Sequence, residues 1–263
     1  MKINKKILPK NLLDIIAFNT LRECNDSNSP YDGNNCCDYT GDAIFHALAN
    51  KFDLAQTLGV GINSIFSPLQ VHGNDVKVID EKFLLQGVAD RAIALKNYDA
   101  IVTNQPNIVI GVHTADCLPI VLCDEEAKVI GVAHAGWRGT VGKIARNTVE
   151  AMQKLGADPK NIIVGIGPAI CFDCFEIGDE VVAEFETAGF LIDDIMERIP
   201  RTGKAHIDLQ KANQILLKMA GISAENIWTS NECTKCKPLQ YYSARELGIN
   251  SGRNFTGIIR FER

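Results

Sequence analysis

The sequence predicts an α/β protein in which the sheets are covered on both faces. Three nearly continuous apolar runs of β-forming residues, typical of strands buried on both sides, occupy residues 108–112, 118–123 and 129–133. Segments with the helical spacing of apolar residues precede and follow these runs. Sheet packed against sheet with helices outside would produce this pattern. No Pro/Gly/Ser-rich linker, charge block or repeat interrupts the chain, so we expect a single domain over residues 1–263.

The N-terminal part predicts little regular structure. Residues 1–40 are the least regular part of the chain, and residues 25–39 are rich in turn-forming side chains. Residues 41–59 have helical spacing and end in glycine, which predicts a helix. We interpret His46, within this helix, as a packed or surface histidine.

The next segment contains the first residue of a candidate site. Residues 64–80 alternate apolar and polar side chains, which predicts a strand with Gln70 and His72 on one face. Asp75 follows His72 closely enough to accept a hydrogen bond from its ring.

The C-terminal half predicts alternating helices and strands. Residues 140–157 have a strongly amphipathic pattern, with Thr140 as the expected N-terminal cap and Gly156 at the end. Asp208 is the expected cap of a later helix. We also expect a buried strand over residues 161–170 and helices over residues 178–189 and 208–221. Residues 226–263 predict a strand, a loop and a final strand.

Charge and hydropathy exclude several classes of protein. The net charge of −5 and the pI of about 5.6 leave no basic surface for a phosphate backbone, so we expect no nucleic-acid partner. The apolar stretches are short and interrupted by charge, and the N-terminus has no small-residue cleavage site. We therefore expect a cytoplasmic protein with no membrane partner.

Nine cysteines, an odd number without an export signal, indicate reduced thiols, some of them metal ligands or nucleophiles. CxxC pairs occur at Cys171 and Cys174 and at Cys233 and Cys236, with 58 residues between them. This separation far exceeds the roughly 15 to 20 residues of a compact zinc ribbon. The spacing favours free thiols over a structural four-cysteine zinc site, and it does not say whether the pairs meet in space.

The apolar runs at 118–123 and 129–133 are joined by a polar turn, so Cys117 and His134 could converge at one end of a sheet. With His72 they offer two neutral ligands and one anion. Three protein ligands and an open fourth position are typical of catalytic zinc, which acts as a Lewis acid or activates water. The alternative is three unrelated buried residues.

The segment AHAGWRGTVGK places Arg138 between two glycines at the start of a helix. Free backbone amides and the helix dipole favour an anion there, and the guanidinium suits phosphate or carboxylate. The alternative is an arginine that pairs with a nearby acid.

Several segments together resemble the YfiH family, also called laccase-domain or multicopper polyphenol oxidase-like proteins. They are QVHG, TADCLPIVL, AHAGWRGT, IGPAIC with CFEIGDEV, and YYSARELGINSGRNFTGII, preceded by YDGNNCCDYTGD. Their order and spacing match the family across roughly residues 28 to 260. One departure is FNTLREC, in which Leu21 separates the threonine from Arg22, so this arginine is not assigned a role in anion binding.

The resemblance implies a compact α/β/β/α sandwich and a zinc site made by His72, Cys117 and His134. It also implies purine nucleoside phosphorylase activity, in which phosphate attacks C1′ of the nucleoside as the base departs. Members of the family are also assigned adenosine deamination and methylthioadenosine phosphorolysis at the same site, so the resemblance implies these activities as well. Purine nucleoside and phosphate would then be the small-molecule partners, with Cys117 and His134 catalytic and with Arg138 and Arg245 as candidates to hold phosphate.

The oxidase name can be tested against the available ligands. A multicopper centre uses about ten histidines, usually with His-x-His pairs, because copper in these geometries prefers imidazole nitrogen. This chain has five histidines and no His-x-His pair. The sequence therefore makes copper an unlikely cofactor.

Two alternatives belong to other functional classes. In one, Cys117 and His134 are the nucleophile and base of a cysteine-dependent hydrolase or deamidase, as the resemblance of the fold to deamidase toxins would allow. In the other, the protein is not catalytic and binds a partner through its zinc cleft.

Overall fold

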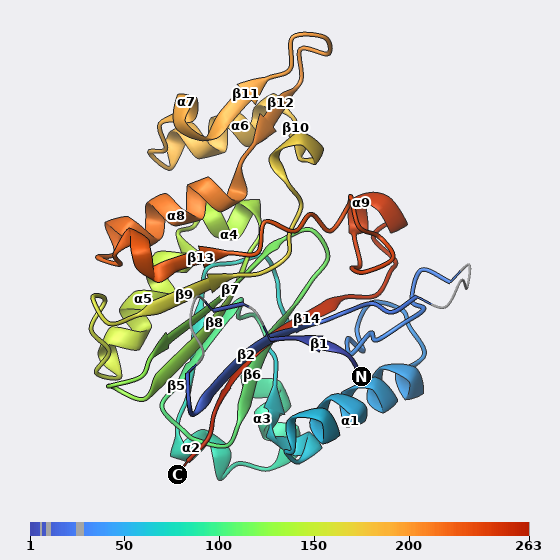
Figure 1. Cartoon of the computed structure of the whole chain (residues 1–263), viewed down its shortest axis with the longest axis vertical. Helices are drawn as coiled ribbons and strands as arrows, with labels where there is room; N and C mark the ends of the chain where they lie inside the picture. Colours follow the sequence, from blue (N-terminus) through green and yellow to red (C-terminus); the bar gives the residue numbers. More distant parts are fainter. Residues whose placement is uncertain (6, 9–11, 25–28, 263) are drawn as a thin grey trace.

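The computed structural model describes residues 1–5, 7–8, 12–24 and 29–262. Two sheets packed face to face form its centre (Figure 1). One sheet has five strands in the order β1 (Ile3–Asn4), β2 (Ile15–Thr20), β14 (Asn254–Arg260), β6 (Val109–Thr114) and β3 (Ile65–Phe66). The other has six strands in the order β13 (Ile227–Thr229), β9 (Ile163–Ile166), β7 (Leu118–Asp124), β8 (Val129–Ala135), β5 (Ala100–Thr103) and β4 (Val76–Ile79).

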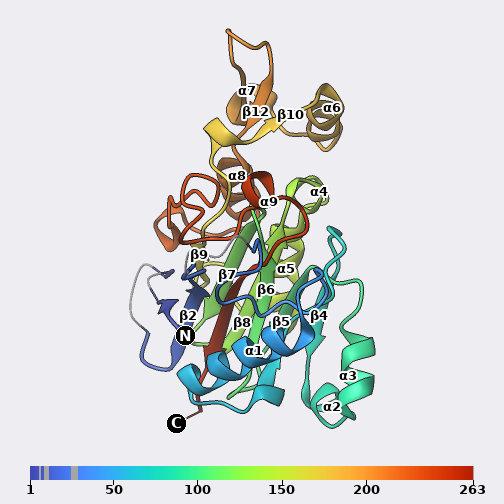
Figure 2. The same ribbon diagram turned by 90° about the vertical axis from the view of Figure 1, so that its right-hand side faces the viewer.

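Helices cover the outer faces of both sheets. On the six-stranded sheet lie α4 (Trp137–Val141), α5 (Ile144–Lys154) and α8 (Leu209–Met219). The five-stranded sheet is covered by α1 (Ile44–Leu58), which lies in front of it in Figure 2. Further short helices in the described part of the chain are α2 (Glu81–Leu84), α3 (Val88–Ala94) and α9 (Ala244–Leu247).

A small unit projects beyond α8 at the upper end of Figure 1. It contains α6 (Asp179–Thr187), α7 (Ile192–Ile195) and a three-stranded sheet in the order β10 (Glu176–Ile177), β12 (Ala205–Ile207) and β11 (Met196–Arg198). Three 3₁₀ turns lie at Ile62–Ser64, Phe172–Cys174 and Ala224–Asn226 among the described residues.

Strand alternation explains the layers. In β7, Ile120 packs toward α5 and α8, whereas Val121 packs between the two sheets. In β6, Ile110 faces the space between the sheets and Val109 faces α1. Both faces of each central strand are therefore apolar, as the continuous apolar runs required. The expected α/β/β/α sandwich is confirmed.

The expected helix over residues 140–157 is interrupted. Lys143 has a left-handed backbone, with φ of 63°, and divides α4 from α5. Thr140 therefore does not cap the longer helix, and its hydroxyl instead donates to the carbonyl oxygen of Gly136 within α4. The expected cap at Asp208 is confirmed, because its carboxylate accepts the amide of Lys211 at 2.9 Å.

Two N-terminal expectations also differ from the structure. Residues 1–40 were expected to be irregular, but they contain β2, which pairs with β14. The apolar side chains of β2 pack both between the two sheets and against the layer of α1. Residues 6, 9–11 and 25–28 of this segment lie outside the described part. The strand expected over residues 64–80 exists only as β3 and β4. Between them the backbone turns at His72, which has a φ of 60°.

Candidate metal and active site

His72, Cys117 and His134 converge at one end of the six-stranded sheet. Their ligating atoms all lie within 4.8 Å of one another. Cys117 directly precedes β7, and His134 pairs in register with Pro119 near the end of β8. The antiparallel hairpin therefore brings the two together, as the sequence predicted, and the turn before β4 adds His72.

A buried carboxylate that sequence analysis did not identify supports two of these residues. Asp99 precedes β5 and is fully buried, and its Oδ1 lies 2.7 Å from Nδ1 of His134. The same carboxylate accepts the backbone amides of Val71, His72 and Gly73 at 3.2, 3.0 and 2.7 Å. These amides have a side-chain acceptor in place of a strand partner, which explains why the expected strand breaks here.

The prediction that Asp75 accepts a hydrogen bond from the ring of His72 is wrong. The side chain of Asp75 is exposed, and the contact to the site that the described residues show is made by its carbonyl oxygen, which accepts the amide of Asp99 at 3.1 Å. The signal that could have identified Asp99 is an acid directly before a buried strand, in the segment NYDAIVT. An ionised side chain at such a position needs a buried partner.

Charge within the site favours a thiolate beside an imidazolium. Burial raises the pKa of the Cys117 thiol, but the charge and hydrogen bonds of His134 and His72 lower it to about 6. Burial lowers the pKa of His134, whereas Cys117 and Asp99 raise it to about 9. Asp99 itself has a pKa below its ordinary value, because His134 and the amides of Gly73 and Val71 outweigh its burial. The pair is thus disposed as thiolate and imidazolium when no metal is bound.

The donor set suits a metal ion with borderline-soft preferences, such as zinc. Asp99 holds Nδ1 of His134 as a donor, which leaves Nε2 free as a ligand. A Cβ at Gly136 would lie 2.8 Å from Sγ of Cys117, so only glycine leaves the sulfur accessible here. Three protein donors leave a coordination position for water or substrate, as in catalytic zinc sites.

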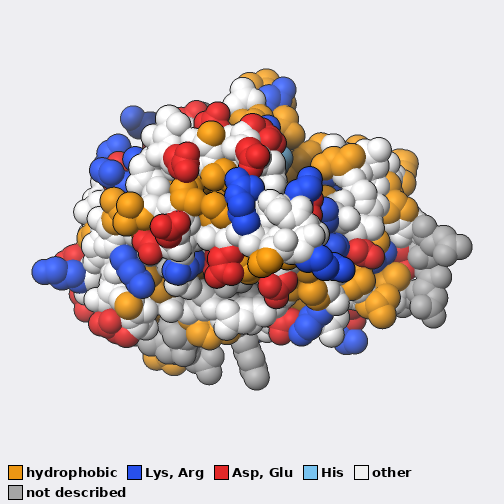
Figure 3. All heavy atoms as spheres, turned by 90° about the horizontal axis from the view of Figure 1, so that it is seen from above, with side chains coloured by type: hydrophobic (Ala, Val, Ile, Leu, Met, Phe, Trp, Pro, Cys, Tyr) orange, Lys and Arg blue, Asp and Glu red, His pale blue; other side chains and the backbone are white. Residues whose placement is uncertain are grey.

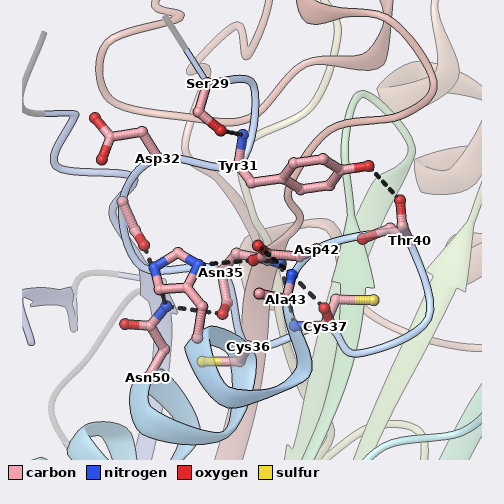
Figure 4. Close-up of polar contacts among 12 residues, drawn as sticks. Ser29, Tyr31, Asp32, Asn35, Cys36, Cys37, Thr40, Asp42, Ala43 and Asn50 are labelled. Carbon is pink, nitrogen blue, oxygen red and sulfur yellow. Dashed lines mark hydrogen bonds and ion pairs between the residues drawn. The ribbon is translucent and has the colours of Figure 1, made fainter. Parts of the chain in front are cut away.

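These residues open on a cavity of about 440 Å³, to which the N-terminal loop contributes Tyr39, Thr40 and Gly41. The loop is held by its own polar contacts (Figure 4). The Tyr31 hydroxyl donates to the carbonyl oxygen of Thr40, and Asn35 donates to the Asp42 carboxylate at 2.7 Å. His46, which the sequence left as packed or surface, lies 2.8 Å from the same carboxylate.

Further along the chain, Gln70, His113, Ala244, Ile249, Asn250 and Arg253 also line this cavity. Gln70 spans the backbone of His113, accepting its amide at 2.7 Å and donating to its carbonyl oxygen at 2.8 Å. Burial lowers the pKa of His113 to about 3, so its ring is neutral.

The candidate anion-binding arginines lie elsewhere. Arg138 stacks on Trp137 at 4.1 Å and lines a separate hollow with Gly73 and Asn74. Arg245 is exposed and donates to the carbonyl oxygen of Glu176, although the preceding Ala244 lines the cavity.

Two further arginines have defined surroundings. Arg253 lines the cavity and donates to the carbonyl oxygens of Ser251, Gly252 and Ile249, which fixes its guanidinium. The sequence, in which Arg253 lies within the segment SGRNF, did not identify this arginine as a candidate for the site. Arg22 is buried and donates to three backbone carbonyl oxygens, one of them 2.7 Å away on Pro238, so its role is structural.

Residues 16–261 match the sequence family described as Multi-copper polyphenol oxidoreductase laccase. The chain belongs to this family. The resemblance to YfiH proteins is thereby confirmed. Some relatives are similar over nearly their whole length. "Adenosine deaminase RL5", from an unknown prokaryotic organism, is 47% identical over 260 residues, which cover 99% of each chain.

Other relatives carry a different name. "Purine nucleoside phosphorylase" from Deinococcus radiodurans is 38% identical over 92% of this chain and 87% of its own. The namesake from Bacteroides thetaiotaomicron is 33% identical over 94% and 92%. The crystal structure of YlmD from Geobacillus stearothermophilus superposes with a TM-score of 0.87 and 28% identity, covering 97% of this chain and 99% of that one.

The distribution of charge on the surface and the lengths of the helices bear on possible partners. Lys and Arg side chains lie among Asp and Glu side chains on the face seen in Figure 3. In the described part of the chain, none of the helices has the length and apolar character needed to cross a bilayer.

The position of Asp99 predicts its effect on metal affinity. We expect Asp99→Asn to weaken metal binding about 10- to 100-fold, because the ring of His134 and the turn at His72 lose their common anionic acceptor. Competition with a chelator measures this affinity. Asp75→Asn is the matched control and should bind metal as the unsubstituted chain does, whereas equal affinity in both variants would contradict the role of Asp99.

The environment of Cys117 predicts an unusual pH dependence of alkylation. In chelator-treated protein, iodoacetamide should modify Cys117 with a midpoint near pH 6, because the thiolate persists down to the pKa of about 6. An ordinary thiol would react with a midpoint near 8.5. Mass spectrometry of the Cys117 peptide gives the measurement. Zinc-loaded protein should resist alkylation across the same pH range. If Cys117 is modified as rapidly in zinc-loaded as in chelator-treated protein, the result would instead favour a free nucleophile.

Proposed function

We propose that this chain is a zinc-dependent purine nucleoside phosphorylase. Its substrates would be adenosine, inosine, guanosine or methylthioadenosine with phosphate, and its products the free base and the sugar 1-phosphate. The observation that supports this most strongly is the convergence of His72, Cys117 and His134 beside a cavity of about 440 Å³. Small-molecule sites typically enclose about 300 to 1,000 Å³. The names of the relatives support the reaction class.

In this proposal His72, Cys117 and His134 would hold zinc, and the bound ion would supply Lewis-acid stabilisation of the departing purine. Asp99 keeps the imidazole of His134 in a single tautomer and orientation, so no reorganisation is needed during the reaction. The substrate would lie between the loop of Tyr39 and the segment from Ala244 to Arg253, both of which line the cavity. Phosphate would attack C1′ from the side of the sugar opposite the base, while the bond from C1′ to the purine nitrogen breaks. The departing purine nitrogen takes up the proton that hydrogen phosphate gives up on becoming the ester.

Phosphate requires cations close to the cavity. Arg253 is part of the lining, and its contacts to three carbonyl oxygens keep the guanidinium in place without neutralising it. Arg245 follows the lining residue Ala244 and would need to leave the carbonyl oxygen of Glu176 and the ring of Phe175. We therefore propose Arg253 and Arg245 as the phosphate ligands, in preference to Arg138 in its separate hollow.

Adenosine deamination is the second candidate activity. It is favoured by the relative named adenosine deaminase, which is 47% identical to this chain. Deamination consumes water in place of phosphate and releases ammonia, so the two reactions can share the purine-binding part of the cavity. They differ in whether the glycosidic bond is retained.

The two other classes remain distinguishable from these. In a cysteine-dependent hydrolase, the lowered pKa of Cys117 would serve nucleophilic attack, and zinc would inhibit rather than activate. A non-catalytic binding protein would show no turnover of any purine nucleoside.

Product analysis tests the proposal. Zinc-loaded protein with inosine and phosphate should release hypoxanthine and ribose 1-phosphate, and adenosine without phosphate should yield inosine if deamination also occurs. Cys117→Ala should lose at least about a hundredfold in kcat/KM, because a metal ligand is removed. Cys24→Ala, which alters a half-buried cysteine outside the site, is the control. Absence of phosphate-dependent base release in the zinc-loaded sample contradicts phosphorylase activity.

The proposed phosphate ligands predict a kinetic split. Arg253→Ala and Arg245→Ala should each raise the KM for phosphate about tenfold or more, because a hydrogen bond to a charged group contributes roughly 1.5–3 kcal/mol. The KM for inosine should change little. Arg146→Ala, on the exposed face of α5, is the matched control. A rise confined to Arg138→Ala would locate phosphate beside α4 and contradict the proposed positions.

A further inference from the structure

A second group of potential ligands lies outside the cavity. Cys171, Cys174, Cys233 and Cys236 come together with all four sulfurs within 4.8 Å of one another. The separation between the CxxC pairs in the sequence does not prevent this, because β9 and β13 are parallel neighbours. The segments that leave the same ends of these two strands therefore run side by side, with Ala169 bridged to Cys233.

Distances among these sulfurs fit one metal ion. The Sγ atoms of Cys174 and Cys236 are 3.5 Å apart, far beyond a disulfide bond of about 2.05 Å. Two sulfurs bound at 2.3 Å to one tetrahedral ion would lie about 3.8 Å apart. An iron–sulfur cluster would hold its cysteine sulfurs farther apart, because several cluster atoms lie between them. The spacing therefore favours a single ion.

The backbone also stabilises negative charge on the sulfur. The amides of Cys171 and Cys236 each point at Sγ of Cys233 from 3.4 Å. Bonds from amides to a thiolate favour its ionised form, which is the form that binds metal. Cys233 is buried and Cys236 exposed, so an ion could enter from the surface.

We propose that these four cysteines form a second zinc site, with a structural role. Four thiolates complete a tetrahedral shell and leave no position for water or substrate, which is typical of structural zinc. The proposal of this site does not rest on the proposed catalytic function, because the four cysteines share no ligand with the group at Cys117.

The contacts around Asp116 indicate what such an ion would hold in place. The Asp116 carbonyl oxygen accepts the amide of Ile170 at 2.9 Å, and its carboxylate accepts the Thr234 hydroxyl at 2.7 Å. Ile170 precedes one CxxC pair and Thr234 lies within the other. Asp116 has a left-handed backbone, with φ of 86°, and directly precedes Cys117. An ion that joins the two cysteine segments therefore fixes the turn that presents Cys117.

Metal counting by elemental analysis tests the proposal. The unsubstituted chain should hold two zinc ions. Cys171→Ser with Cys236→Ser should hold one, His72→Ala with His134→Ala should also hold one, and the combination should hold none. Cys24→Ser, a cysteine outside both groups, is the matched control and should retain two. X-ray absorption of the His72→Ala and His134→Ala protein should show only sulfur neighbours, at about 2.3 Å.

Three outcomes would overturn the second site: one zinc in the unsubstituted chain that the cysteine substitutions leave unchanged, iron in place of zinc, or a disulfide between the pairs. Should the substituted chains fail to fold, X-ray absorption of the unsubstituted chain still decides. If both sites hold zinc, one ion has four sulfur ligands and the other has one, so the measured average is about 2.5 sulfurs per ion. If only the group at Cys117 holds zinc, the average is one. Absence of phosphorolysis in the unsubstituted chain that holds two zinc ions would contradict only the proposed function.

Discussion

The candidate site depends on the buried carboxylate of Asp99. Burying an ionised carboxylate is costly unless it is hydrogen-bonded, and here it meets the ring of His134 and the amides of three successive residues, 71–73. The order of strands explains its reach, because β5 lies between β8 and β4. A side chain at the start of β5 can therefore hold the histidine of β8 and the turn that precedes β4. Two of the three potential ligands depend on this one group.

The sequence predicted the features of the fold and the site that depend on the local pattern of apolar residues. Continuous apolar runs identified β7 and β8, and the antiparallel hairpin brought Cys117 and His134 to the same end without any long-range information. Asp99 was not predicted, because it is far in sequence from the groups it holds and its partners are mostly backbone amides. The same contact broke the strand expected at His72. Alternation of side chains predicts a strand only where the backbone amides have strand partners.

Spacing along the chain was also a poor guide to the cysteines. The rule for a zinc ribbon assumes that both CxxC pairs belong to one local unit. In this fold the pairs follow two parallel strands, and parallel neighbours place equivalent ends together whatever the length of the connection. The intervening residues form α6, α7 and the small sheet, which project beyond the main sheets, and then α8, which packs on the six-stranded sheet (Figure 1). Topology, rather than proximity in sequence, assembles these sulfurs.

The two ligand groups differ in the number of protein donors, and this difference determines what each can do. His72, Cys117 and His134 supply three donors beside a cavity, so a metal there can meet a substrate. The four cysteines supply a complete shell, so a metal there can only join chain segments. Asp116 links them, because it contacts both cysteine segments and precedes Cys117. The precision with which Cys117 is held therefore depends on the cysteine segments as well as on the hairpin that it begins.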